Sequence, residues 1–69
     1  MEFLVKSDSK ITKKTLEKLN LKPNVIVAAI YRNNQVITPS GKDTIQKGDS
    51  VIIITTNTGL GSIDDIIAE

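Results

Sequence analysis

Residues 25–38 read VIVAAIYRNNQVIT, and this stretch decides the fold. Its first part, residues 25–31, is rich in β-branched side chains and hardly alternates between apolar and polar positions. Such a run is typical of a strand covered on both faces. Asn33 and Asn34 tolerate the positive φ values of a tight primed turn, so the chain is expected to reverse there into a second strand over residues 35–38. The sequence therefore predicts a β-hairpin near the middle of the chain.

The chain after the hairpin predicts one more long strand. Pro39 ends the hairpin, because proline has no N–H to donate to a neighbouring strand. Residues 44–45 are expected to form a brief extended piece, and residues 47–49, Lys-Gly-Asp, a turn. Residues 51–56 are again almost continuously apolar and are expected to lie centrally in the sheet.

The flanking segments predict a first strand and two short helices. Residues 3–5 are apolar and read as a short strand. A helix is expected over residues 13–19, with Thr12 as its N-cap, and a second over residues 63–68, with Ser62 as its N-cap. The neighbouring acids in the first turn of that last helix suit the helix dipole.

The predicted order is β-α-β-β-(β)-β-α, which indicates an α+β domain with a mixed, mostly antiparallel sheet. The 69 residues form one domain, residues 1–69, with a small core and no cysteine to reinforce it. One sheet with two small helices cannot cover both faces of two apolar strands. A second copy of the chain is the simplest cover, so we expect a homodimer.

The composition argues against catalysis. With no histidine and no cysteine, the Ser-His-Asp and Cys-His arrangements and the usual transition-metal sites are absent. The net charge is +1, and Phe3 and Tyr31 are the only aromatic residues, so the lysines of the first third read as solvated side chains rather than a nucleic-acid surface. No apolar run approaches the length of a membrane span. We expect a non-enzymatic domain with no cofactor, no nucleic acid and no direct membrane insertion.

Three polar motifs have an ordinary structural explanation. Asp43 and Asp49 could join a divalent-ion site through their oxygens, but each also suits a turn. The Gly59-x-Gly61 spacing lacks the third glycine and the βαβ context of a phosphate-binding loop, and fits a hinge. Asp64 and Asp65 point in different directions on a helix and make a poor acid-base pair.

Four segments in this order resemble the TrkA-C (RCK-C) domain family, the C-terminal regulatory domain of Trk/Ktr-type potassium uptake regulators. They are KTLEKLNL at 14–21, VIVAAIYR at 25–32, QVITP at 35–39 and DTIQKGDSVII at 43–53. The resemblance covers residues 2–67. The sequence departs from the family where Lys42 separates Gly41 from Asp43, which alters a loop beside any ligand pocket.

The resemblance implies a role rather than a reaction. Family members pair through these domains at the cytoplasmic face of a cation transporter or channel, and some bind a small ligand such as cyclic di-AMP between the two copies. The chain is then expected to be part of a longer subunit with an N-terminal nucleotide-binding lobe, and to be cytoplasmic and peripheral to the inner membrane. A ligand there would favour one arrangement of the pair over another.

The candidate ligand-contact residues lie around the hairpin: Ile30, Tyr31, Arg32, Asn33, Asn34, Ile37 and Pro39. Apolar walls, an arginine that can pair with phosphate, two amides and a flat proline ring would suit a cyclic dinucleotide. The same residues also have structural readings as core, solvated charge, turn and edge packing.

Two further classes of protein stay open. A purely structural dimerisation module would explain the paired strands without any ligand. A β-grasp-like carrier or RNA-binding domain is the other, suggested by residues 45–52, although a carrier should end in Gly-Gly and this chain ends in Ala68-Glu69.

Overall fold

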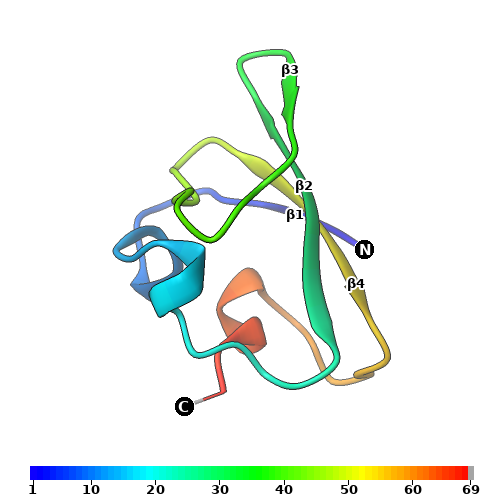
Figure 1. The fold of residues 1–69 in the computed structure, drawn as a ribbon. Helices are drawn as coiled ribbons and strands as arrows, with labels where there is room; N and C mark the ends of the chain where they lie inside the picture. The colour runs from blue at the N-terminus through cyan, green and yellow to red at the C-terminus, as the bar shows by residue number, and fades with distance from the viewer. Residues whose placement is uncertain (69) are drawn as a thin grey trace.

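The computed structural model describes residues 1–68, which form one small four-stranded sheet with three helical turns packed on it. In the sheet the strands follow the order β1-β4-β2-β3, so the central pair is β4 and β2. Every strand pairing is antiparallel. The strands are β1 Glu2–Leu4, β2 Val25–Arg32, β3 Gln35–Ile37 and β4 Ser50–Thr55 (Figure 1).

The predicted strands are confirmed, with small shifts at their ends. The two long apolar runs form β2 and β4 at the centre of the sheet, as expected. The expected parallel component is not found, since all pairings between named strands are antiparallel. The extended piece at residues 44–45 is also wrong as a strand, because Thr44 makes only an isolated bridge to Thr15.

The expected helix over residues 13–19 is wrong. Two separate 3-10 turns, η1 Lys10–Thr12 and η2 Leu16–Lys18, take its place. The backbone N–H groups of Leu16 and Glu17 donate to Asp43 O and Gly41 O, both at 2.9 Å. Because these donors are used by the neighbouring loop, they cannot join the i to i−4 bonds of one continuous α-helix.

The N-cap of the first turn is Ser9, not Thr12. The Ser9 hydroxyl accepts a hydrogen bond from Ile11 N at 3.4 Å, and Thr12 Oγ1 accepts one from Ser9 N at 3.1 Å. Thr12 therefore closes the capping box from the opposite end of the turn. The sequence predicted an N-cap in this region, but the predicted residue, Thr12, lies three positions after the observed one, Ser9.

The last helical segment is also a 3-10 turn, η3 Ile63–Ile66, with Ser62 at the N-cap as expected. Asp65 Oδ2 accepts hydrogen bonds from Gly61 N at 2.8 Å and Ser62 N at 3.0 Å. These two bonds lower the pKa of Asp65 below its ordinary value. The carboxylate of Asp65 therefore caps the start of η3.

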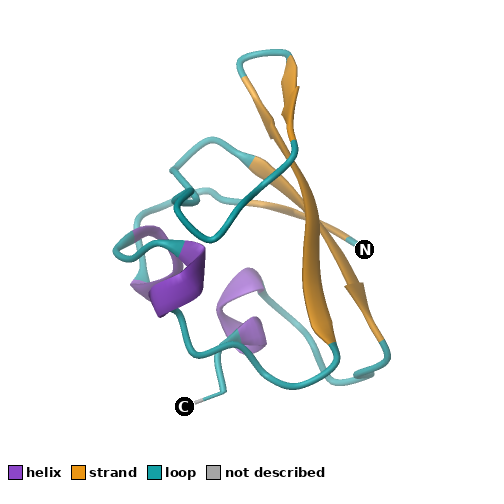
Figure 2. Ribbon diagram, viewed as in Figure 1, coloured by secondary structure: helices purple, strands orange, loops and turns teal. Residues whose placement is uncertain are grey.

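The core lies on one face of the sheet only. All three helical turns sit on that side, and the other side carries no helix within residues 1–68 (Figure 2). Nine apolar side chains are buried between the sheet and the turns and loops: Val5, Ile11, Leu19, Ile30, Ile45, Val51, Ile53, Ile66 and Ile67. The chain thus forms two layers, one of them exposed to solvent on its outer side.

An irregularity in β2 decides which side chains face the core. The pairing of β2 with β4 shifts between Val27 and Ala29, which leaves Ala28 as an extra residue. Side chains alternate between faces along a strand, and a bulge reverses that alternation for the residues beyond it. As a result Ile30 is buried while Tyr31 points away from the core with 43% of its surface exposed.

Five large apolar side chains lie on the uncovered side of the sheet, which we call the open face. They come from all four strands and are 43–63% exposed: Leu4, Ile26, Tyr31, Val36 and Ile54. Cross-strand pairing brings Ile26 next to Ile54 and Tyr31 next to Val36. An apolar surface of this kind on a soluble-protein sheet usually marks an interaction site.

Candidate functional site

The β2–β3 hairpin extends beyond the rest of the domain (Figure 1). Its register places Tyr31 opposite Val36 and Arg32 opposite Gln35. Asn33 and Asn34 form the turn with φ values of 53° and 65°. The primed turn predicted from the two asparagines is therefore confirmed, since both central residues adopt left-handed backbone geometry.

Arg32, the last residue of β2 before the hairpin turn, forms an ion pair with Asp49. Arg32 Nε donates to Asp49 Oδ1 at 2.9 Å, and Arg32 Nη2 donates to Asp49 Oδ2 at 2.8 Å. Nη2 also donates to Thr44 O at 2.8 Å, and Asp49 Oδ2 accepts from Gln46 N at 2.9 Å. This two-point contact ties the hairpin to the loop that precedes β4.

The two partners of this ion pair differ in exposure. The side chain of Asp49 is 2% exposed and that of Arg32 is 26% exposed. Burial alone would raise the pKa of Asp49. Hydrogen bonds from Arg32 and Gln46 N, together with the arginine charge, outweigh burial, and the pKa of Asp49 lies below its ordinary value. The hydrogen bonds to Asp49 raise the pKa of Arg32. Asp49 is therefore ionised and neutralised in place.

The seven candidate ligand-contact residues do not share one surface. Tyr31, Asn33 and Asn34 are exposed at the hairpin tip and on the open face, and Pro39 is half-buried. Ile30 has no exposed surface and packs in the core, with Ile37 half-buried opposite it. The structure therefore brings together an exposed subset at the tip, and ligand binding by any of the seven stays a prediction.

Asp43 and Asp49, the two acids considered for a divalent-ion site, accept hydrogen bonds within turns instead. Asp49 pairs with Arg32, and Asp43 Oδ2 accepts from Ser40 N at 2.7 Å. Among residues 1–68 there is no group of three or more Asp and Glu side chains close enough to hold a metal ion. The turn explanation for both residues is confirmed.

Sequence reasoning missed two features of this region. It assigned Arg32 to a ligand and Asp49 to a turn, without pairing them. It also gave no separate role to the side chains that form the open face with Tyr31, namely Leu4, Ile26, Val36 and Ile54. The sequence of β4 is apolar at consecutive positions and carries no signal for the open face; only the structure separates buried Ile53 from exposed Ile54.

The chain belongs to the TrkA-C domain family, whose model matches residues 1–68. This match covers all of the described fold, including the hairpin, the Arg32–Asp49 pair and the open face. None of the helical segments within residues 1–68 has the length and hydropathy that a transmembrane helix needs.

Curated relatives come from archaea. The chain is 29% identical over 66 residues to "Trk system potassium uptake protein TrkA homolog 2" of Methanosarcina mazei, covering 96% of this chain and 15% of that protein. It is 34% identical over 53 residues to TrkA homolog 1 of Methanosarcina mazei, covering 77% of this chain and 13% of that protein. A TrkA homolog of Archaeoglobus fulgidus is 36% identical over 55 residues, covering 80% and 13%. The chain thus spans about one seventh of these relatives.

Proposed function

We propose that the chain is a non-catalytic regulatory module of a potassium-transport system. It works as a homodimer whose paired surfaces sense a small ligand, cyclic di-AMP being the first candidate. Family membership and the names of the relatives support the potassium role. The parent complex would then place the module at the cytoplasmic side of a membrane transporter.

The main support for a homodimer is the exposed apolar surface of the open face. Ile26 and Ile54 lie side by side on the two central strands, 60% and 59% exposed, toward one end of the uncovered apolar surface. A second copy of the same face would bury these side chains, and each buried methylene contributes about 0.8 kcal/mol. Two such sheets packed together would complete the cover that one chain lacks.

The exposed hairpin tip supports ligand sensing at the edge of this pair. Tyr31 lies on the open face, and the amides of Asn33 and Asn34 follow directly after it at the turn. An aromatic ring next to free amide donors and acceptors can contact a base and its polar edge. Arg32 serves here as a positioning residue, because most of its hydrogen-bonding capacity goes to Asp49 and Thr44 O.

Calorimetric titration with cyclic di-AMP and a panel of mononucleotides tests the sensing part of the proposal. We expect cyclic di-AMP to bind the wild type, and the double variant Asn33→Gly/Asn34→Gly to weaken binding about tenfold through loss of two amide groups. Glycine keeps the positive φ values of this turn, so the hairpin is retained. Arg32→Ala is a poorer variant, since it also leaves Asp49 buried without its partner.

Asn24→Gly is the matched control for this experiment. Asn24 is exposed and also has a positive φ, 64°, but it lies in the turn before β2, at the opposite end of the strand from the hairpin tip. Its substitution should leave the affinity unchanged. A firm dimer that binds no nucleotide in the panel would contradict sensing and favour the alternative function, a purely structural dimerisation module.

A further inference from the structure

Positive charge is concentrated in one short segment of the chain. Residues 10–22 hold five lysines and one glutamate, a net charge of +4. The whole chain carries +1, so the other residues together carry −3. The segment folds into the two turns η1 and η2, and therefore collects this charge on the helical side of the sheet.

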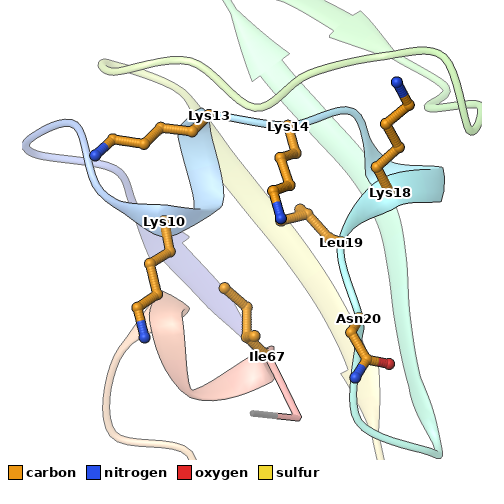
Figure 3. Close-up of a pocket in the computed structure, with 7 residues that line it drawn as sticks. All are labelled: Lys10, Lys13, Lys14, Lys18, Leu19, Asn20 and Ile67. Atoms are coloured by element: carbon orange, nitrogen blue, oxygen red, sulfur yellow. The ribbon is translucent and has the colours of Figure 1, made fainter.

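Four of these lysines surround a hollow of about 280 Å³, which we call the lysine hollow. Lys10, Lys13, Lys14 and Lys18 line it together with Leu19 and Ile67. The two apolar residues are almost completely buried, at 8% and 6% exposure, and so form a floor beneath the exposed lysines. Asn20 adds an amide at one end (Figure 3).

The four lysines form no ion pair with a carboxylate of residues 1–68. Arg32–Asp49 is the sole side-chain ion pair within residues 1–68, so no carboxylate of this part of the chain lies within 4.0 Å of the four ammonium nitrogens. Glu17, the one acid of the segment, packs its side chain against Gly41. In Figure 3 the Lys14 side chain runs down beside Leu19 and Lys10 runs down toward η3, while Lys13 points to the left and Lys18 upward.

Lysines that form no ion pair within residues 1–68, around an apolar floor, fit a ligand with two kinds of surface. Lysine is a flexible point charge that can swing onto a phosphate, and several lysines together suit a chain of phosphates better than a single one. The volume of about 280 Å³ lies just below the range of about 300–1,000 Å³ for small-molecule sites, so part of a bound ligand would extend out of the hollow. A floor of Leu19 and Ile67 would favour a phosphate compound that also carries an apolar or ring portion.

We propose that the lysine hollow binds an organic polyphosphate of the size of a nucleoside triphosphate. The phosphates contact the lysines, and the nucleoside rests against Leu19 and Ile67. The site lies on the helical side of the sheet, away from the open face and the hairpin tip. It is therefore independent of the dimer and of cyclic di-AMP sensing, and it stands or falls separately from both.

Titration of the isotope-labelled chain with ATP, followed by ¹H–¹⁵N correlation spectra, tests the site residue by residue. We expect the shifted signals to fall in residues 10–22 and 66–68 and to leave the hairpin unchanged. Inorganic triphosphate should bind more weakly than ATP, and adenosine should not bind measurably. Raising the salt concentration from 50 to about 500 mM should weaken ATP binding, since exposed charges are screened beyond a few ångströms there.

Charge-reversal variants with a matched control separate a site from simple net charge. Lys14→Glu/Lys18→Glu should weaken ATP binding at least about tenfold, because each exposed ion contact contributes a factor of about two to five and reversal adds repulsion. Lys42→Glu/Lys47→Glu makes the same change in net charge at exposed lysines outside the hollow and should cost about twofold or less.

Three outcomes would overturn the proposal. The first is an equal loss of ATP affinity in both double variants, which would show that binding depends only on the net charge of the chain. The second is a set of ATP-induced shifts centred on the open face or the hairpin tip. The third is binding of single-stranded RNA or of phosphatidylglycerol vesicles by a chain that does not bind ATP, which would make this surface a contact for a different kind of partner.

Discussion

Asp49→Asn is expected to lower the free energy of unfolding by about 2–4 kcal/mol. The substitution removes the charge that neutralises Arg32 and replaces a carboxylate that accepts from Arg32 and Gln46 N. Arg32 keeps some contact with water, at 26% exposure, which limits the loss. For a domain of this size the melting temperature should fall by about 10–20 °C, measured by circular dichroism at fixed protein concentration.

Asp43→Asn is the control for this prediction. Asp43 lies in the same loop and carries the same charge, but its carboxylate accepts from Ser40 N near the surface. Its substitution should cost about 1 kcal/mol or less. If Asp49→Asn costs no more than this control, the buried ion pair does not hold the hairpin to the loop.

The pH dependence of stability provides a second readout of the same ion pair. The folded pKa of Asp49 lies below its unfolded value of about 3.9, so its contribution is present above that pH and is lost as the pH falls through the folded pKa. Wild-type stability should therefore decline below about pH 4. In Asp49→Asn this part of the acid-induced decline should be missing, while the part due to Asp65 remains.

The strands could be predicted because their signals are local. β-branched runs favour strands and a pair of asparagines favours a primed turn, and both signals lie within the segment that adopts the structure. The prediction of a helix over residues 13–19 was wrong because the conformation of this segment depends on contacts with residues that are distant in the sequence. The N–H groups of Leu16 and Glu17, which an α-helix would use internally, donate instead to the carbonyls of Asp43 and Gly41. No pattern within residues 13–19 indicates this contact.

The candidate site was harder to predict because it depends on which face each side chain takes. The extra residue at Ala28 reverses the alternation in β2, so Ile30 enters the core and Tyr31 leaves it. From sequence alone the unbroken apolar run reads as a strand covered on both sides. Within residues 1–68 only one side of the sheet is covered, and the other is the open face; a partner that covers it stays a prediction.

Ile54→Lys is expected to convert a homodimer into a monomer. Ile54 is 59% exposed on the open face, beside Ile26 on the neighbouring central strand. A lysine there would have to lose its hydration in the interface, and Glu2, which pairs with Ile52 on the same face, offsets only part of that cost. The dissociation constant should therefore rise at least about tenfold. Sedimentation velocity over a concentration series measures this directly, since wild type should approach twice the mass of one chain.

Thr58→Lys is the matched control, because it adds the same charge at an exposed position in the loop after β4. It should leave the dimer intact. Ile54→Lys should retain the far-ultraviolet circular dichroism spectrum of wild type, since Val51 and Ile53, the β4 side chains that face the core, are unchanged. A folded wild-type chain that sediments as a monomer at high concentration would contradict the dimer and leave the open face for a different partner. A dimer that survives Ile54→Lys with an unchanged dissociation constant would place the interface elsewhere, because a buried lysine at this position would have to weaken the contact.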